Sequence, residues 1–425
     1  MEHQIYLNLN VRGLPVSATL GINELSNQLI AEGRKVYKLG LGQSPFPVPL
    51  PVVEALQANA HQKDYLPVRG LPALREAVAD YYQRTQNLSF QSEHVLVGPG
   101  SKELMFILQL VYYGDLVIPT PSWVSYAPQA QIAGRHVHWL PTSRDNRWLL
   151  TPAELDKLCR KDPSKPRIVI LNYPNNPTGC SYTDAELAAL AEVARKYHVI
   201  MLSDEIYGEL HFEGEHISIA RHYPEGTIIS SGLSKWCGAG GWRLGTFAFP
   251  AELDWLASAM AVVASETFTA TSAPIQYAAV RAFRGGPRIE AYLSQSRRIL
   301  KTLNNHCLAR FTAADVFVAP PQGAFYMLPD FSAHRDTLLS RGITTGTELC
   351  QRVLEETGVA FLPGSAFGRP EEELTARIAL VDFDGAKTLA AAERTPLHEP
   401  LPADFLTTNC FKMVEAIDLV CDWLK

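Results

Sequence analysis

Short apolar segments alternate with segments of helical pattern through the middle of this 425-residue chain, and this alternation limits the folds open to it. The apolar runs are rich in Val, Ile and Leu, a composition typical of buried strands. We expect strands at residues 94–97, 116–118, 136–140, 167–171, 199–202, 227–230 and 244–249. The pattern predicts an α/β fold, with a mostly parallel sheet between layers of helices.

Two of the intervening segments carry clear helical signals. Residues 102–112 place Leu104 and Leu108 on one face, as an amphipathic helix requires. Residues 183–197 begin with Thr183, and Glu186 follows three positions later. That spacing is typical of a capping box, so we expect a helix to begin there.

The length exceeds that of one average domain, so we expect two domains that share a large core. Residues 1–50 include Pro45, Pro47 and Pro49 and predict an extended arm. We expect a large cofactor-binding domain at 51–300. The smaller α+β domain would combine the arm with residues 301–425.

One segment of the second half differs in composition from its surroundings. Residues 385–408 contain Pro396, Pro400 and Pro402 and predict an inserted loop, to which no function is assigned.

Composition excludes several classes of protein. The net charge of -6, without a basic stripe, gives no basis for nucleic-acid binding. No apolar run approaches the roughly 18 residues of a membrane span, and residues 1–5 show no secretion signal. Seven cysteines without a Cys-x-x-Cys pair favour neither a disulfide framework nor a zinc site. We expect a cytoplasmic protein that binds no metal.

Polar and glycine-rich segments follow five of the expected strands. They are residues 98–102, Trp123, 172–179, 204–207 and 231–235. Ligands of open α/β sheets bind outside the carboxyl ends of the strands. The sequence therefore predicts that these segments form a single site.

The segment 231–245 carries the strongest chemical signal, with the sequence Ser-Gly-Leu-Ser-Lys-Trp-Cys-Gly-Ala-Gly-Gly-Trp-Arg-Leu-Gly. Lys235 lies among small residues, where its amine can be desolvated and form an imine. Arg243 and the serines can bind a phosphate group. An imine-forming lysine beside a phosphate anchor is what pyridoxal phosphate requires. A glycine-rich surface loop with a solvated lysine is the alternative.

As a whole, this segment resembles the lysine signature of the class I/II (fold-type I) pyridoxal-phosphate-dependent aminotransferases. The resemblance extends from about residue 39 to the C-terminus, and the most similar members are the prokaryotic-type aspartate aminotransferases. It implies a seven-stranded, mostly parallel sheet in the large domain and a homodimer with shared active sites. It also implies that Lys235 holds the cofactor as a Schiff base and transfers the substrate proton.

Three further motifs match cofactor-binding residues of this family. The resemblance implies that Asp204 keeps the pyridine nitrogen protonated and that Tyr207 hydrogen-bonds the phenolic oxygen of the ring. Asn176 would bind the same oxygen and contact the substrate, although Tyr173 stands where the family has a proline. Trp123 would stack on the ring; the alternative is a buried core aromatic.

The phosphate group would be held at a helix N-terminus. Gly100, Ser101 and Lys102 precede or begin an expected helix, whose backbone N–H groups favour anions. The resemblance implies that Arg243 completes this phosphate site.

One position of the lysine signature departs from the family pattern. Gly232 stands where the family often has a serine, so we expect Ser234 or Ser231 to replace that hydroxyl.

Three residues are implied to act on the substrate or across the dimer. Arg377, in an apolar strand, would clamp the substrate α-carboxylate with two parallel hydrogen bonds. The backbone of Gly42 would contact the substrate. Tyr65 would cross the dimer interface to the phosphate of the neighbouring subunit.

These features predict transfer of an amino group from an L-amino acid to a 2-oxo acid. The segment 17–19 resembles a substrate contact of aspartate aminotransferases, which favours aspartate or glutamate. No basic residue is assigned to a second substrate carboxylate, so aromatic or alanine-type donors stay open. A pyridoxal-phosphate-dependent lyase of the same fold is a second alternative, and a non-catalytic cofactor-binding regulator is the least favoured.

Overall fold

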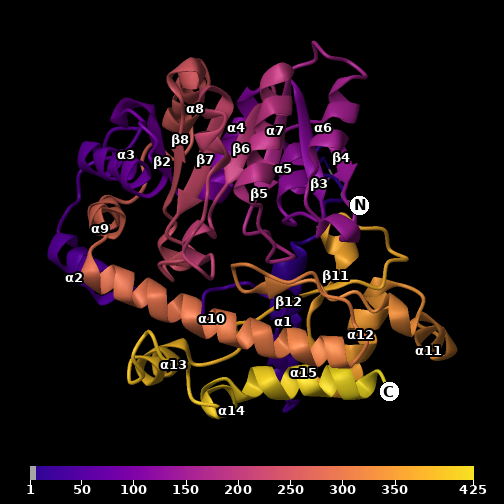
Figure 1. Ribbon diagram of the computed structural model, residues 1–425. Helices are drawn as coiled ribbons and strands as arrows, with labels where there is room; N and C mark the ends of the chain where they lie inside the picture. The colour runs from indigo at the N-terminus through magenta and orange to yellow at the C-terminus, as the bar shows by residue number, and fades with distance from the viewer. Residues whose placement is uncertain (1–5) are drawn as a thin grey trace, which may run out of the picture.

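The computed structural model describes residues 6–425, which form a seven-stranded sheet with helices on both faces (Figure 1). The strand order is β2-β8-β7-β6-β5-β3-β4. All neighbours run parallel except β8, which is antiparallel to β2 and β7. The strands are β2 (Val95–Gly98), β3 (Asp115–Thr120), β4 (Val137–Pro141), β5 (Arg167–Asn172), β6 (Ile200–Asp204), β7 (Thr227–Gly232) and β8 (Gly245–Ala248). The expected α/β fold with a mostly parallel sheet is confirmed.

The central strands are buried on both faces because they are apolar at almost every position. In β5, Ile168 and Ile170 pack with α4 (Ser101–Val111), α5 (Tyr126–Ile132) and α8 (Asp254–Glu266). Val169 and Leu171 point to the opposite face and pack with α6 (Pro152–Cys159) and α7 (Asp184–Lys196). A strand that alternates between two apolar layers must lie in the middle of the domain.

The helix expected at 183–197 is confirmed as α7, with its capping box. The Thr183 side chain accepts a hydrogen bond from the backbone of Glu186, whose carboxylate accepts one from the backbone of Thr183. The capping box thereby fixes the N-terminal end of α7, which follows the loop that carries residues 172–179.

The remaining elements surround the sheet or form a second layered region below it in Figure 1. Along the sheet lie α2 (Leu50–Asn59), α3 (Pro72–Gln86) and α9 (Ala273–Arg284). The second region contains β9 (Tyr326–Met327), α11 (Arg335–Ser340), α12 (Gly346–Thr357), β10 (Val359–Ala360), β11 (Leu362–Pro363), β12 (Ala376–Ala379) and α15 (Phe411–Trp423). The strand β1 (Tyr37–Lys38) pairs with β10, so a segment from the N-terminal part of the chain joins this second region.

One long helix, α10 (Pro287–Ala313), runs beneath the sheet and connects it to the second region (Figure 1). It continues through residue 300 without a break. The domain boundaries at 50 and 300 stay a prediction.

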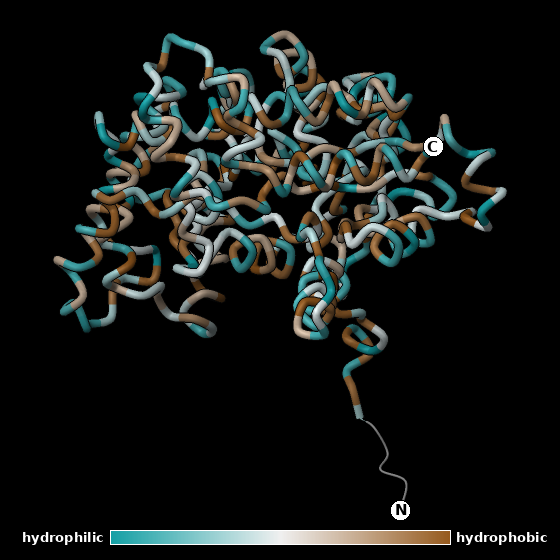
Figure 2. The backbone as a smooth tube through the Cα atoms, turned by 90° about the horizontal axis from the view of Figure 1, so that it is seen from below, coloured by the Kyte–Doolittle hydropathy of each residue, from teal (hydrophilic) through white to brown (hydrophobic). Residues whose placement is uncertain are grey.

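The expectation of an extended arm over residues 1–50 is wrong for part of that range. Residues 18–31 form the helix α1 (Ala18–Ala31), which docks through Ile22 and Leu29 against Val36 and Leu354. The prolines that suggested an extended chain all lie C-terminal to this helix, at 45–51. In Figure 2 the chain near the N-terminus stands apart from the main body.

The loop expected at 385–408 begins and ends with helices. Residues of α13 (Gly385–Ala392) precede the first proline, and Asp384 caps this helix by accepting from the backbone of Lys387. A second helix, α14 (Phe405–Asn409), follows the last proline. Arg298 of α10 donates to backbone carbonyls of the intervening turn, at Ala392, Thr395, Pro396 and Glu399.

The sequence predicts neither a secretion signal nor a membrane span. Residues 1–5, from which we expected no secretion signal, lie outside the described residues. Within residues 6–425, no helix combines the length and the apolar character that a membrane span requires.

Candidate active site

A cavity of about 550 Å³ opens at the carboxyl edge of the large sheet. Its lining includes eleven of the residues predicted from the sequence. They are Gly42, Ser101, Lys102, Trp123, Asn176, Asp204, Tyr207, Ser234, Lys235, Arg243 and Arg377. The structure therefore brings the segments that follow separate strands into one site, as the topology requires.

The lysine amine lies at the end of β7 and points across the cavity. Lys235 Nζ donates to the backbone carbonyl of Gly42, at 2.7 Å. It also lies 5.7 Å from the ring centroid of Tyr207 and 5.9 Å from that of Phe325. The amine is thus held by a short hydrogen bond to a carbonyl and by contacts with two aromatic rings, and no carboxylate within the described residues forms an ion pair with it.

Asp204, the last residue of β6, presents a buried carboxylate to the same cavity. Tyr126 donates to its Oδ2 at 2.6 Å, and Ser230 donates to Oδ1 at 3.4 Å. Burial raises the pKa of Asp204 to about 6, although these hydrogen bonds and the charge of Lys235 oppose the shift. A carboxylate in such surroundings is stabilised strongly by any cation brought against it.

The N-terminus of α4 lies on another side of the cavity, beside Arg243. Gly100 is the N-cap of α4, and a Cβ at this glycine would collide with the Arg243 guanidinium. Arg243 itself has a left-handed backbone with φ of 55°, which is uncommon for a residue with a side chain. Helix N–H groups, the Ser101 hydroxyl and a guanidinium together favour a bound anion.

The two hydroxyls considered as replacements near Gly232 differ in position. Ser234 lines the cavity, whereas Ser231 does not and is buried. Gly232 pairs with Gly245 of β8, and a Cβ at position 232 would lie 2.6 Å from the carbonyl oxygen of Leu244. The close approach of β7 and β8 accounts for the glycine.

Arg377 of β12 is a buried cation whose charge is not neutralised. Its side chain is 1% exposed, and no carboxylate among residues 6–425 forms an ion pair with it. The guanidinium donates to the carbonyl of Gly40 and, at 3.3 Å, to Asn176 Oδ1. The Nε atom has no hydrogen-bond partner among the described residues, and burial lowers the pKa of the Arg377 guanidinium. An unpaired buried charge is costly, so this site favours a bound carboxylate.

The sequence of the chain matches a known family over most of its length. The family model described as aminotransferase class I and II matches residues 34–392 of the chain. The chain belongs to the class I and II aminotransferases. The resemblance expected from the lysine signature is confirmed.

Individual relatives of this aminotransferase are similar over most of their length. The aspartate aminotransferase of Geobacillus stearothermophilus is 35% identical, with 85% of this chain and 91% of the relative covered. The aspartate/prephenate aminotransferase of Thermus thermophilus is 31% identical, with coverage of 85% and 91%. The solved structure of Thermus thermophilus aspartate aminotransferase with maleate has a TM-score of 0.83 at 27% identity, covering 99% of this chain and 100% of the other.

Two tyrosines of the aminotransferase site were not predicted from the sequence. Tyr126 lies three residues after Trp123, packs edge-on against it at 5.2 Å and holds Asp204. Tyr326, on β9, has its hydroxyl 2.9 Å from that of Tyr207. The position of Tyr126 on a buried helical turn was a usable signal, whereas nothing near Tyr326 in the sequence points to the site.

Two predicted residues lie elsewhere than the cavity of the single chain. Tyr65 is 92% exposed and does not line the cavity, and Gly100 contributes the helix N-cap behind it. Lys102 does line the cavity, but its Nζ lies over the Trp123 ring, 5.2 Å from the centroid. Burial, with the nearby charges of Arg243 and Lys235, lowers the pKa of Lys102.

The raised pKa of Asp204 leads to a prediction about the cofactor-free aminotransferase. Because the folded pKa is above the ordinary value of 3.8, the stability contributed by this group is complete below pH 4 and is lost as pH rises through about 6. Asp204→Asn does not titrate, so above pH 6 it should gain stability relative to the parent. The relative gain between pH 4.5 and pH 8 should be on the order of 2–3 kcal/mol, measured by urea unfolding.

The exposed Asp80, changed to Asn, is the matched control and should show no such pH-dependent difference. If the stability difference between Asp204→Asn and the parent is the same at both pH values, Asp204 does not titrate in this range.

Proposed function

We propose that this aminotransferase uses pyridoxal phosphate to transfer the amino group of a dicarboxylic L-amino acid, aspartate or glutamate, to a 2-oxo acid. The observation that carries the proposal is that one cavity holds three complementary groups. These are the amine of Lys235, the buried carboxylate of Asp204 and the unpaired guanidinium of Arg377.

The residues around the cavity fit pyridoxal phosphate in size and chemistry. A volume of about 550 Å³ is within the range of small-molecule sites. Asp204 suits a protonated ring nitrogen, because a cation there relieves the cost of a buried carboxylate. The N-terminus of α4, Ser101 and Arg243 suit the phosphate group. Lys235 supplies the amine that an aldehyde requires.

When bound, pyridoxal phosphate supplies an aldehyde and an electron-accepting ring that stabilises negative charge at the Cα of an amino acid. Lys235 Nζ then acts as the base that takes the Cα proton and as the acid that returns it. Its partners are a backbone carbonyl and two aromatic rings rather than a carboxylate, so the amine can exchange them for the substrate without breaking an ion pair.

Three other side chains orient the reacting groups. Tyr207 and Asn176 present a hydroxyl and an amide to the cavity, where they can donate to an anionic ring oxygen. Trp123 gives a flat surface for stacking, with its ring supported edge-on by Tyr126. Together these side chains would hold the cofactor ring with one face toward Lys235.

The charge of the cavity favours a substrate with two carboxylates. Its lining contains four cationic side chains, Lys102, Lys235, Arg243 and Arg377, and one carboxylate, Asp204. Arg243 is accounted for by the phosphate and Arg377 by the α-carboxylate. Lys102 is left for a second substrate carboxylate. The names of the aspartate aminotransferase relatives support a substrate with two carboxylates.

We also infer that the active enzyme is a cytoplasmic homodimer. Tyr65 is almost fully exposed in the single chain, which is consistent with its predicted position across the interface beside the partner's phosphate site. All seven cysteines are buried and free, as suits a reducing compartment.

The function is tested by incubating the cofactor-loaded protein with single amino acids and following its visible absorbance and products. Aspartate and glutamate should give their 2-oxo acids, and a 2-oxo acid should reverse the reaction. Release of ammonia or sulfide in place of a 2-oxo acid and aminated cofactor would assign the protein to the lyases.

The role of Lys102 leads to a separate prediction. Lys102→Met should raise the KM for aspartate by about tenfold or more, because a charge-assisted contact is lost, and change the KM for alanine by less than about twofold. Lys157→Met, at an exposed position of α6, is the matched control. Equal effects on aspartate and alanine would show that Lys102 does not select the second carboxylate.

A further inference from the structure

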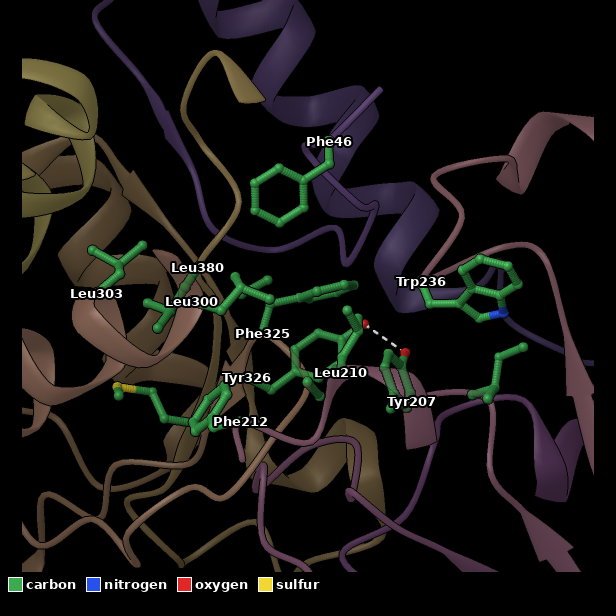
Figure 3. Packing of buried hydrophobic residues seen from close by; sticks show 14 of the residues in the cluster. Phe46, Tyr207, Leu210, Phe212, Trp236, Leu300, Leu303, Phe325, Tyr326 and Leu380 are labelled. Atoms are coloured by element: carbon green, nitrogen blue, oxygen red, sulfur yellow. Dashed lines mark hydrogen bonds between the residues drawn. The ribbon is translucent and has the colours of Figure 1, made fainter. Parts of the chain in front are cut away.

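Tyr326 contacts both Arg377, which the proposed function assigns to the substrate, and Tyr207, which it assigns to the cofactor. It lies on β9, outside the large sheet, and is 1% exposed. Figure 3 shows it beside Phe325, with its hydroxyl joined to that of Tyr207. Its ring and its hydroxyl meet different partners, so the two contacts can be separated by mutation.

The ring of Tyr326 lies against the buried cation. The guanidinium carbon of Arg377 is 4.8 Å from the Tyr326 ring centroid and 4.9 Å from that of Phe367. Aromatic rings at this distance attract a guanidinium, and the attraction is stronger where water is excluded. Since Arg377 forms no ion pair within residues 6–425, these rings and the hydrogen bonds to Gly40 and Asn176 are what hold it in place.

The hydroxyl of Tyr326 lies beside Tyr207 and the backbone of Gly42. It is 2.9 Å from the Tyr207 hydroxyl and donates more weakly to the carbonyl of Gly42, at 3.4 Å. The same carbonyl accepts from Lys235 Nζ. A Cβ at position 42 would collide with the Tyr326 hydroxyl, so the glycine leaves room for it.

We propose that Tyr326 is a positioning residue for both substrate and cofactor. Its ring orients Arg377 toward the substrate carboxylate, and its hydroxyl orients the Tyr207 hydroxyl toward the ring oxygen of the cofactor. In this role the Tyr326 hydroxyl donates its proton to the Tyr207 oxygen at 2.9 Å rather than to the more distant Gly42 carbonyl. A hydroxyl that accepts a hydrogen bond becomes a better donor, so Tyr326 strengthens the donation by Tyr207. This inference rests on the proposed use of pyridoxal phosphate.

Two substitutions separate the two roles. Tyr326→Phe removes the hydroxyl and keeps the ring, whereas Tyr326→Leu removes both. One readout is the midpoint of the pH titration of the visible absorbance of cofactor-loaded protein. The other is the Kd for maleate, a dicarboxylate that is not an amino donor, measured by calorimetry.

Tyr326→Phe should shift the absorbance midpoint by about 0.3–1 pH unit, in the same direction as Tyr207→Phe, with the maleate Kd within about twofold of the parent. Tyr326→Leu should give that shift and also weaken maleate binding by about tenfold. A residue that serves only packing would lower thermal stability without separating the two readouts. If Tyr326→Leu does not fold, Tyr326→Met, which is also without a ring, takes its place.

The inference is overturned if Tyr326→Phe leaves the absorbance midpoint unchanged, or if a folded variant without the ring binds maleate as the parent does. Failure of the proposed function has a different signature. In that case the parent itself would keep no pH-dependent visible absorbance after incubation with pyridoxal phosphate and removal of the unbound cofactor.

Discussion

Lys235→Ala is expected to abolish transamination, with a loss of at least about 10⁴-fold in kcat. The amine of this residue both joins the cofactor and moves the Cα proton. The other lysine of the cavity lining, Lys102, lies with its Nζ over the Trp123 ring. No third lysine lines the cavity among the described residues, so we expect no neighbouring amine to take over.

The measurement is a single-turnover assay with aspartate, together with the Kd for pyridoxal phosphate. Lys161→Ala, at an exposed position outside the cavity lining, is the matched control and should keep parental turnover. Near-normal turnover of Lys235→Ala would remove the basis of the proposed mechanism.

Arg377→Lys is expected to weaken substrate binding by about 10- to 100-fold, with a smaller effect on kcat. A guanidinium can donate two parallel hydrogen bonds to a carboxylate, whereas an ammonium acts as a single point charge. The planar group also loses its contact with the rings of Tyr326 and Phe367.

Calorimetric titration with maleate measures this loss directly, without turnover. Arg394→Lys, which makes the same change at an exposed position, should bind maleate as the parent does. An unchanged maleate Kd in Arg377→Lys would show that the substrate carboxylate binds elsewhere.

The sheet and the residues that follow its strands were predictable because both are local in the sequence. Apolar runs mark the strands, and Asp204 and Lys235 come directly at or after strand ends. Parallel topology then places these residues at one edge, without knowledge of tertiary contacts.

The residues missed depend on packing between distant segments. Tyr326 enters the site only because β9 pairs with β12, which carries Arg377, and places the tyrosine ring beside that guanidinium. The role of Lys102 could not be separated from the phosphate turn, because its orientation over Trp123 is set by tertiary structure.

Two segments that were expected to be irregular proved partly helical. The prolines near residue 47 and those at 396–402 were read as characteristic of the whole surrounding range. Proline acts locally, however, and both α1 and α13 end before the prolines begin.

The most direct test of the account is reduction of the cofactor-loaded protein with borohydride, followed by digestion and mass spectrometry of the peptides. We expect about one pyridoxyl label per chain, on the peptide that contains Lys235, and no label on this peptide in Lys235→Ala. A protein that is active in transamination but carries no label on the Lys235 peptide would contradict the account.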